Sequence, residues 1–205
     1  MAIEVFNRYE KKYIIDEDTF HKLTYQIADY MNPDAYNRNG EAYRISNIYY
    51  DTENDQLIRA SIEKPIYKEK LRLRAYGTPE LTDNVFVEIK KKYNGIVNKR
   101  RTSMTLQEAY DFIDDDMCPG HEGRINRQVL KEIDYFKNFY HLQPKVYLSY
   151  DRFAYFEKDD GDFRITFDKN ITTRREDIRL EHGSYGKKLL PDGQYLMEVK
   201  ISGAV

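Results

Sequence analysis

The stretch Tyr67–Gly77, "YKEKLRLRAYG", decides how the rest of the chain is interpreted. Read with the two-residue period of a β-strand, its cations fall on one face and its apolar residues on the other. The cations are Lys70, Arg72 and Arg74, and the apolar residues are Leu71, Leu73 and Ala75. The apolar face predicts contact with a core. The three cations then face either solvent or an anion, and the other strands have to distinguish these two possibilities.

The composition predicts a folded protein that is rich in β-structure. The chain has 205 residues, of which 40% are hydrophobic, so a sizeable core is possible and global disorder is not expected. It contains 19 Tyr and 10 Phe but no Trp, and aromatic residues favour strands. The net charge of −2 gives no general attraction to nucleic acid or to an anionic membrane. Any cationic site therefore has to come from the arrangement of residues.

Cysteine content and hydropathy exclude several classes of protein. Cys118 is the single cysteine, so no disulfide can form within the chain, and no zinc-ligand spacing is present. The sequence contains neither a Walker A loop nor a GxGxxG motif. The first residues lack a signal-peptide pattern, and no later stretch approaches the length of a membrane span. We therefore expect a reduced, cytoplasmic, soluble protein without a membrane segment.

Periodicity and turn signals predict an α+β protein with an antiparallel sheet, organised as a single domain over residues 1–205. A helix is expected to begin after Asp16 and to present Phe20, Leu23, Ile27 and Tyr30 on one face. Further helices are expected over residues 54–62, over residues 105–113 and near residues 126–140. The helix over residues 105–113 begins with a capping box formed by Thr105 and Glu108. Strands are expected over residues 3–15, 43–52, 67–76, 85–93, 97–104, 145–156, 162–172 and 194–201, with a tight turn at "YNGI" (93–96) and another at "EKDDGD" (157–162).

The pattern of the opening stretch recurs in the other predicted strands. Their polar faces carry ten cations against four anions, although the chain has a net charge of −2. The cations are Arg8, Lys12, Lys70, Arg72, Arg74, Lys90, Lys92, Arg152, Arg164 and Lys200, and the anions are Glu10, Glu88, Asp168 and Glu198.

A solvated outer face explains any one of these strands, because antiparallel sheets often expose one face to water. It explains the whole set less well, because like charges opposite each other on neighbouring strands are destabilising. If the sheet closes into a barrel of about eight strands with helices packed outside, the polar face becomes a cationic tunnel. A chain of phosphates is the expected ligand, since Arg and Lys both bind phosphate. The few carboxylates would then suit a hard divalent cation.

Seven segments carry a resemblance to a known family. They are "RYEKKY" (8–13), "YYDT" (49–52), "KLRLRAYG" (70–77), "VFVEIKKKYNGIVNKRR" (85–101), "YDRFAYF" (150–156), "FRITFD" (163–168) and "LMEVKI" (196–201). In this order they span nearly the whole chain, and together they resemble the triphosphate tunnel metalloenzymes, the CYTH-like superfamily. Within that superfamily the chain is most similar to the VTC domain, the polyphosphate polymerase module of vacuolar transporter chaperone complexes and of bacterial relatives.

The resemblance implies transfer of the γ-phosphate of ATP onto inorganic polyphosphate inside the tunnel, with Mn²⁺ or Mg²⁺ as cofactor. It implies phosphate contacts from Lys12, Arg72, Arg74, Lys90, Arg152 and Arg164, with Lys200 on the same face as Glu198, which matches the metal-binding glutamate of the family. One more cation at a tunnel mouth is expected from Lys99, Arg100 or Arg101. Further candidates are Arg8, Lys70 and Lys92 for substrate contacts, and Glu10 and Glu88 for the metal.

One departure from the superfamily pattern bears on the reaction. The hydrolytic branch carries Glu-x-Glu-x-Lys on its first strand, whereas this chain has Arg8 at the first position, followed by Glu10 and Lys12. The exchange of a carboxylate for a cation weakens a two-metal, water-activating site and favours phosphate binding. Polymerase activity is therefore the main prediction.

Three alternatives remain. The first is a metal-dependent triphosphatase of the same fold, acting on inorganic or nucleoside triphosphates, and the second is a non-catalytic polyphosphate-binding module. Nucleic-acid binding is the third and weakest, because no RNA-binding signature accompanies the basic "NKRR" segment (98–101). The family usually continues into a C-terminal helical segment, which we do not expect here because the sequence ends at "KISGAV" (200–205).

Overall fold

The computed structural model describes residues 8–37, 39–94, 96–120, 125–159 and 163–202. Its strands are β1 (Arg8–Asp16), β2 (Met31–Pro33), β3 (Tyr43–Asp51), β4 (Tyr67–Tyr76), β5 (Asn84–Tyr93), β6 (Ile96–Thr105), β7 (Gln143–Glu157), β8 (Arg164–Arg174), β9 (Lys187–Lys188) and β10 (Gln194–Ser202). Its helices are α1 (Glu17–Ile27), α2 (Gln56–Ile62), α3 (Leu106–Asp114) and α4 (Arg127–Tyr140), with a short 3₁₀ turn at Ala35–Asn37. The strand pairs with a described register are antiparallel, which confirms the α+β class. Over these ranges, no helix is both long enough and apolar enough to span a membrane.

The contacts gather in two compact units, and each is described by itself. Unit 1 comprises Met1–Ile45, Ser149–Thr173 and Gly186–Val205, and unit 2 comprises Ser46–Leu148 and Arg174–Tyr185. Strands β3 and β7 contribute residues to both units. The closure of the strands into a barrel, which the resemblance implies, stays a prediction, as does the single domain.

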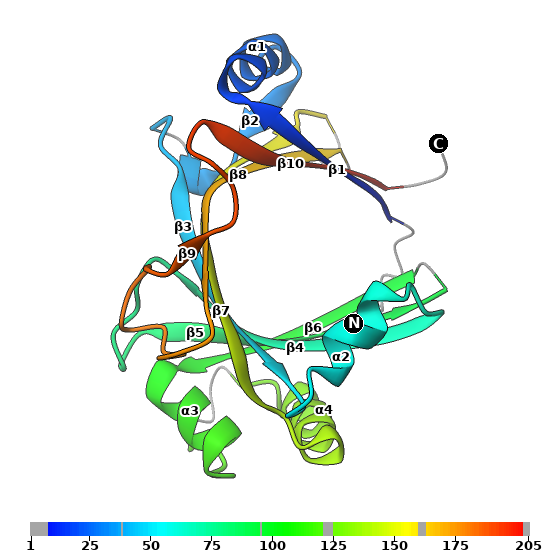
Figure 1. The fold of residues 1–205 in the computed structure, drawn as a ribbon, viewed down its shortest axis with the longest axis vertical. Coiled ribbons are helices and arrows are strands. Elements are labelled where there is room, and N and C mark those ends of the chain that lie inside the picture. The colour runs from blue at the N-terminus through cyan, green and yellow to red at the C-terminus, as the bar shows by residue number, and fades with distance from the viewer. Residues whose placement is uncertain (1–7, 38, 95, 121–124, 160–162, 203–205) are drawn as a thin grey trace. The chain divides into compact units, whose positions relative to one another are not determined.

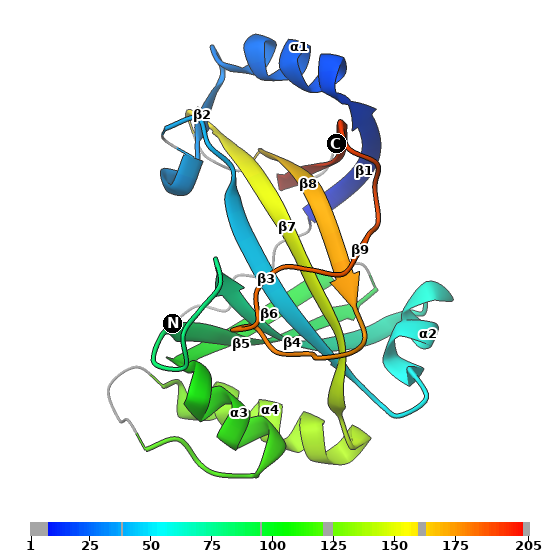
Figure 2. The ribbon, with the colours of Figure 1, turned by 60° about the vertical axis from the view of Figure 1, so that its left-hand side comes forward.

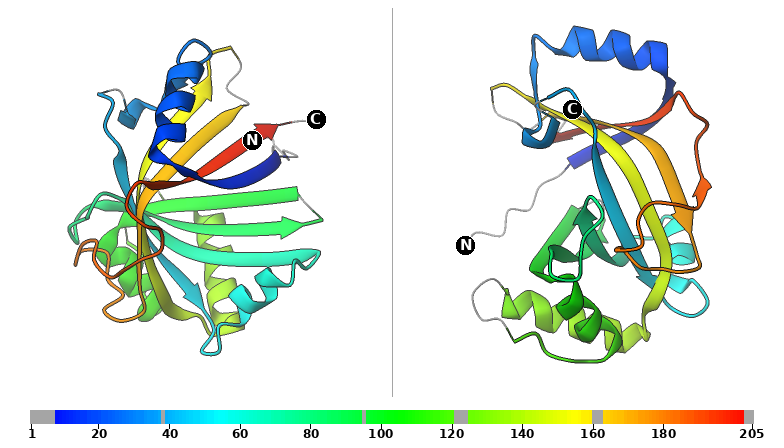
Figure 3. Two further views of the ribbon diagram at one scale, coloured as in Figure 1. Left: turned by 45° about the horizontal axis from the view of Figure 1, so that its top comes forward. Right: turned by 90° about the vertical axis from the view of Figure 1, so that its left-hand side faces the viewer.

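Unit 1 is built on the strand order β1-β10-β8-β7, with β2 on β7 and β9 on β8. Figure 3 shows β1 and β10 side by side, with α1 crossing nearby. Helix α1 begins as predicted, because an Asp16 side-chain oxygen accepts a hydrogen bond from the Thr19 amide at 2.8 Å. Its buried residue Phe20 stacks on Tyr195 of β10 at 4.3 Å between ring centroids and also contacts Phe167 of β8. These aromatic side chains cover one face of the unit 1 strands, and the polar side chains lie on the other face.

Unit 2 is built on the strand order β7-β3-β4-β5-β6. Helices α3 and α4 lie on one face of β4, β5 and β6, as Figures 1 and 2 show. That face is apolar: Leu71 and Leu73 of β4 and Val87 of β5 are fully buried in one cluster with Ile133 of α4. Because side chains alternate along a strand, the residues between them lie on the opposite face. The predicted division of the opening stretch into an apolar and a cationic face is thus confirmed.

Local signals in the sequence set several element boundaries correctly. Thr105 and Glu108 form the predicted capping box at the start of α3. The β5–β6 pair ends at Tyr93 opposite Ile96, with Asn94 at φ 44°, as a tight turn requires. Gly95 of that turn lies outside the described residues, as do residues 3–7 of the first predicted strand and residues 160–162 of the "EKDDGD" turn.

Two predictions about local structure were wrong. Helix α1 ends at Ile27, so Tyr30 does not lie on its apolar face and is 73% exposed. The predicted strands leave a gap between residues 15 and 43, but Met31–Pro33 within it forms the short strand β2 beside β7. Strands β2 and β9 are too short for a two-residue period to be recognised, so the sequence predicts about eight strands where the described residues contain ten.

Candidate functional site

The face of unit 2 opposite its helices carries the cations of β4, β5 and β6. We call it the cationic face, and it consists of Lys68, Lys70, Arg72, Arg74, Lys90, Lys92, Lys99 and Arg101, with Glu88 among them. The strand register sorts these residues into rows that run across the three strands. Arg72 lies opposite Glu88, which lies opposite Arg101. Antiparallel register thus brings together residues from three separate strands.

The next two rows toward the β5–β6 turn contain lysine. Lys70 lies opposite Lys90, which lies opposite Lys99, and in the following row Lys68 lies opposite Lys92. Like charges in directly opposite positions are destabilising. Consistent with this crowding, burial and the charges of Lys92 and Lys70 lower the pKa of Lys68. We call these five residues the lysine rows, and their charge favours an anion above them.

Glu88 is the counter-charge at the centre of the cationic face. Its side chain is 1% exposed, with Oε2 2.6 Å from Arg72 Nε and 4.0 Å from Arg74 Nε, and Oε1 2.7 Å from Lys99 Nζ. Burial by itself would raise the pKa of Glu88, but Arg72, Arg74 and Lys99 outweigh it and lower the pKa. One carboxylate therefore neutralises part of a surface that carries several cations.

Strand β3 adds two polar side chains that hold the arginines in place. Arg74 is buried and donates from Nε to Asn47 Oδ1 at 2.9 Å. Arg72 donates from Nη1 to the Tyr49 hydroxyl at 3.4 Å. Burial alone would raise the pKa of Tyr49, but Arg72, Arg74 and Lys70 lower it. The arginines are thus oriented by fixed acceptors before any ligand binds, which favours binding of a phosphate group in a defined geometry.

The structure separates Arg100 from the other predicted substrate contacts. Arg100 lies opposite Ile89 in the β5–β6 register, on the apolar face, and forms an ion pair with Glu132 of α4. Lys99 and Arg101 lie on the cationic face instead. A run of consecutive basic residues cannot be divided between faces until the register of its strand is known.

Unit 1 has its own polar cluster, formed where β1 pairs with β10. Lys12 Nζ lies 3.0 Å from Glu10 Oε1 and 2.6 Å from Glu198 Oε1. Lys200 Nζ lies 3.0 Å from Glu198 Oε2 and 3.8 Å from Glu10 Oε2. The two glutamates and two lysines therefore alternate in a ring, which we call the Glu–Lys ring. The side chain of Arg8 is not described, although its backbone pairs with that of Ser202.

The charges of the Glu–Lys ring are strongly coupled. Burial would raise the pKa of Glu198, but the hydrogen bond with Glu10 and the charges of Lys200 and Lys12 outweigh it, so the pKa lies well below its usual value. Burial would lower the pKa of Lys12, but its contacts with Glu198 and Glu10 raise it. Glu198 is therefore stabilised as a carboxylate by its contacts in the ring.

Strand β8 completes the polar face of unit 1. Arg152 of β7 makes two hydrogen bonds to Asp168, at 2.7 and 2.8 Å, and its guanidinium lies 4.9 Å from the centre of the Tyr150 ring. Burial would lower the pKa of Arg152, but the hydrogen bonds with Asp168 and the nearby Tyr150 raise it, so it stays charged. Arg164 lies opposite Lys200 and over the ring of Phe156 at 4.5 Å. The guanidinium of Arg164 therefore lies on the same polar face as Lys200.

The donor set of the Glu–Lys ring fits a divalent cation. Within the described ranges, no cluster of three or more His, Cys, Asp or Glu residues forms an all-protein metal site. Mg²⁺ and similar hard ions are commonly held by one or two carboxylates together with substrate phosphates, and Glu10 and Glu198 supply such a pair. Thr166 lies opposite Glu198, and its hydroxyl oxygen is buried without a hydrogen-bond partner in the part of the chain that is described. A polar group in that position gains a partner if a hydrated ion binds.

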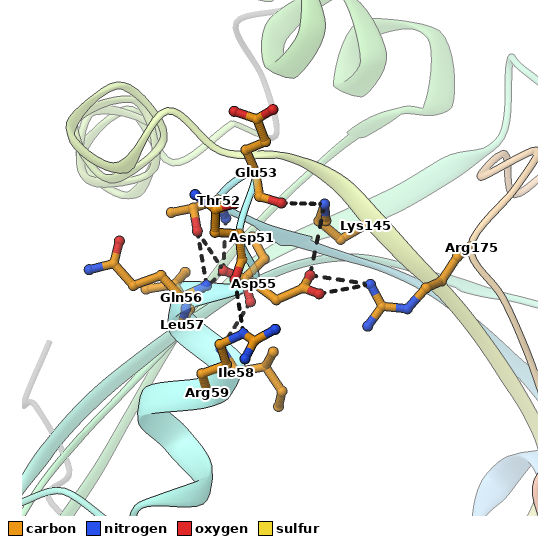
Figure 4. Close-up of polar contacts among 11 residues, drawn as sticks. Asp51, Thr52, Glu53, Asp55, Gln56, Leu57, Ile58, Arg59, Lys145 and Arg175 are labelled. Carbon is orange, nitrogen blue, oxygen red and sulfur yellow. Dashed lines mark hydrogen bonds and ion pairs between the residues drawn. The ribbon is translucent and has the colours of Figure 1, made fainter.

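Two acidic residues at the N-terminal end of α2, Asp51 and Asp55, were not among the residues predicted from the sequence. Asp51 Oδ1 accepts from the Leu57 amide at 2.8 Å and Oδ2 from the Ile58 amide at 2.9 Å, so Asp51 caps the helix from outside it (Figure 4). Asp55 lies 3.1 Å from Arg175 and 3.9 Å from Lys145 in the same close-up. The signal was present in the "YYDT" segment, where an aspartate precedes a helix by a few residues.

Arg174 was also not among the residues predicted from the sequence. Its side chain is hydrogen-bonded to the segment that follows β8, residues 175–185. It lies 3.6 Å from the centre of the Tyr147 ring and 4.2 Å from that of Tyr185. It also donates to the backbone carbonyls of Asp177, Arg179, Gly183 and Tyr185. Its satisfied hydrogen bonds and its burial make it a structural arginine, and no phosphate contact is assigned to it.

Comparison with known proteins agrees with this arrangement. Residues 7–204 match the sequence model of the VTC domain family. A curated relative, subunit 4 of the vacuolar transporter chaperone complex of Schizosaccharomyces pombe, is 27% identical over 197 residues, which cover 84% of this chain and 27% of the relative. The chain therefore spans about a quarter of the length of the curated relative.

Solved structures share the fold at low identity. A putative adenylate cyclase from Bacillus halodurans superposes with a TM-score of 0.52 at 15% identity, covering 97% of this chain and 83% of the other. A putative adenylyl cyclase from Hippeastrum, described as having a dominant triphosphatase activity, superposes with a TM-score of 0.52 at 13% identity, covering 98% and 80%. Likeness at such low identity establishes the fold and leaves the reaction to be argued from the residues.

Proposed function

The chain belongs to the VTC domain family, within the triphosphate tunnel superfamily, and on that basis we propose that it is a metal-dependent phosphotransferase that extends inorganic polyphosphate with the γ-phosphate of ATP. The observation that carries the proposal is the cationic face of unit 2. It combines two arginines held by fixed acceptors with two adjoining lysine rows. The three phosphates of a triphosphate would neutralise only some of these cations. A long polyanion would neutralise more of them.

The distances along the strands support a polymeric substrate. Successive rows lie two residues apart along a strand, and Lys68 is four residues from Arg72, so about 13 Å separates their rows. A triphosphate anchored on Arg72 and Arg74 would leave the outer lysine row without a ligand. A polyphosphate chain continuing from the same arginines would neutralise that row as well.

The proposed reaction needs little acid–base catalysis. A terminal oxygen of polyphosphate attacks the γ-phosphorus of ATP, a new P–O bond forms, and the bond to the β–γ bridging oxygen breaks, which releases ADP. The nucleophile is already anionic, so no proton has to be removed. Catalysis then consists of alignment and charge neutralisation. We assign these roles in unit 2 to Arg72, Arg74 and Lys90. The sequence also predicts phosphate contacts from unit 1, through Lys12, Arg152, Arg164 and Lys200.

We assign the metal to Glu198 and Glu10. Mn²⁺ or Mg²⁺, when bound, would neutralise charge on the transferring phosphoryl group. The lysines of the ring would have to turn toward substrate phosphate as the carboxylates turn toward the ion. Glu88 is left out of this assignment, because its ion pairs are with Arg72, Arg74 and Lys99, whereas Glu198 shares its two lysines with a second carboxylate, Glu10.

The reaction is tested by its products. Purified protein incubated with ATP and Mn²⁺, with and without a short polyphosphate primer, is expected to produce polyphosphate that lengthens with time on a gel, together with ADP. Release of orthophosphate from ATP or tripolyphosphate without chain growth would identify a triphosphatase instead. Metal-independent binding of polyphosphate with no turnover would identify a binding module. Either result would overturn the polymerase proposal.

The outer lysine row supplies a sharper test of the polymeric substrate. Lys92→Ala is expected to weaken binding of long-chain polyphosphate by up to about fivefold, the effect of one partly exposed charge contact, while tripolyphosphate binding stays unchanged. Lys91→Ala is the matched control, because Lys91 is the adjacent residue but pairs with Glu69 on the opposite face. Titration calorimetry at fixed ionic strength with both ligands provides the measurement. Equal losses for the two ligands, or equal losses in the two variants, would contradict a polyphosphate track over this row.

A further inference from the structure

The cationic face ends in aromatic residues at the end opposite the lysine rows. Phe86 of β5 lies opposite Arg74, and Tyr76 of β4 follows Arg74 on the same face. Their rings meet edge to face with centroids 6.0 Å apart, and the guanidinium of Arg101 lies 4.5 Å from the centre of the Phe86 ring. Tyr76 is 41% exposed, and Arg101 is exposed. Phe86 is half-buried, so this cluster is not part of the apolar core.

The rows of the cationic face therefore follow a chemical order. From one end to the other they present Tyr76, then Arg74 beside Phe86, then Arg72 with Glu88 and Arg101, and then the lysine rows. Arginine suits the fork-shaped recognition of a phosphate group, whereas lysine provides point charges along a flexible polyanion. Aromatic rings and guanidinium planes are the surfaces on which nucleobases stack. The order of the rows matches the order of groups in a nucleoside triphosphate joined to a polyphosphate.

We propose that Tyr76, Phe86 and Arg101 form a nucleobase-stacking subsite, and that it fixes the direction of the substrate on unit 2. This inference rests on the proposed function, and it adds the class of donor and its orientation. The base of a nucleoside triphosphate lies against Tyr76 and the guanidinium of Arg101, with Phe86 supporting Arg101 from behind. The phosphates then pass over Arg74 and Arg72, and the polyphosphate chain extends over the lysine rows. Stacking tolerates any base, so this subsite separates nucleotides from inorganic phosphates and does not select adenine strictly.

The structural alternative is that the aromatic pair only packs against the arginines. In that case removal of a ring would disturb Arg101 or Arg74 and weaken every phosphate ligand equally. A ligand that lacks a base distinguishes the two explanations. Inorganic tripolyphosphate carries the phosphates of ATP without its base, so it tests the arginines alone.

Titration calorimetry with ATP and with inorganic tripolyphosphate, on the wild-type chain and on Tyr76→Ala and Phe86→Ala, tests the proposal. We expect each variant to bind ATP about tenfold more weakly and to bind tripolyphosphate with less than about twofold change. Tyr93→Ala is the matched control, because Tyr93 is an exposed aromatic residue of the same strand that lies on the other face and at the other end. Should Phe86→Ala melt at a much lower temperature than wild type, the exposed Tyr76→Ala alone carries the comparison.

Each result separates the hypotheses. Selective loss of ATP affinity supports the stacking subsite. Equal loss for both ligands, or no loss for either, overturns it while the phosphate site stands. A wild-type chain that binds neither ATP nor tripolyphosphate would overturn the proposed function itself, and with it the donor inferred here.

Discussion

Glu198→Gln is expected to lower the rate of phosphoryl transfer by on the order of 100-fold, with tripolyphosphate affinity changed by less than about threefold. The reason lies in the Glu–Lys ring, where Glu198 is one of two carboxylates that face Lys12 and Lys200. Glutamine has nearly the same shape but no charge, so it would bind a divalent cation poorly. The cations that hold phosphate would remain. The substitution should therefore affect the step that depends on metal more than it affects binding.

The measurement combines ATP turnover with Mn²⁺ binding followed in the absence of nucleotide. Glu176→Gln is a suitable control, because Glu176 is an exposed glutamate that belongs to unit 2, whereas the Glu–Lys ring belongs to unit 1. Unchanged turnover and unchanged Mn²⁺ affinity in Glu198→Gln would remove Glu198 from the metal site. Loss of tripolyphosphate affinity equal to the loss of turnover would show instead that Glu198 acts by orienting Lys12 and Lys200 toward phosphate.

The faces of the strands could be predicted from the sequence, because the division into apolar and polar faces follows from a two-residue period. Leu71 and Leu73 are buried and Arg72 lies on the other face, as the alternation of "KLRLR" requires. The same reasoning failed for "NKRR", where basic residues are consecutive. Arg100 could be assigned to the apolar face only after the β5–β6 register was known.

Register and long-range pairing are what the sequence leaves open. The alignment of Lys70, Lys90 and Lys99 into one row depends on how two turns set three strands against one another. The Glu–Lys ring joins Lys12 to Glu198, residues 186 positions apart, through the pairing of β1 with β10. Each residue could be named as a candidate from its strand. The partner of each could not, because partners are chosen by the tertiary fold.

Glu88 illustrates the difference most clearly. The sequence predicted a possible metal ligand, because a carboxylate among cations on a phosphate-binding face has that role in related folds. The structure places this carboxylate against Arg72 and Lys99, almost fully buried, with Arg74 near. It acts as the internal counter-charge that allows these cations to gather before an anion binds. We infer that it also competes with phosphate for them.

This arrangement leads to the prediction with the largest effect on stability. Glu88→Gln is expected to lower the free energy of unfolding of the ligand-free protein by about 3 kcal/mol or more, the usual result when one partner of a buried ion pair is removed. Glutamine keeps the volume, so the loss reports uncompensated charge on Arg72, Arg74 and Lys99 and not a cavity. Urea denaturation followed by circular dichroism, at several concentrations of tripolyphosphate, provides the measurement.

The response to ligand separates a counter-charge from an ordinary structural ion pair. If Glu88 stands in for phosphate, tripolyphosphate should restore most of the lost stability, and the gain from ligand should be larger in Glu88→Gln than in wild type. Glu132→Gln is the matched control, because Glu132 pairs with Arg100 on the opposite face, and its removal should change stability by less than about 1 kcal/mol whether or not ligand is present. A destabilised Glu88→Gln variant that tripolyphosphate does not rescue would contradict the counter-charge role. Arg72, Arg74 and Lys99 would then be held by Glu88 for the fold, and the phosphate contacts would have to come from Lys68, Lys70, Lys90 and Lys92.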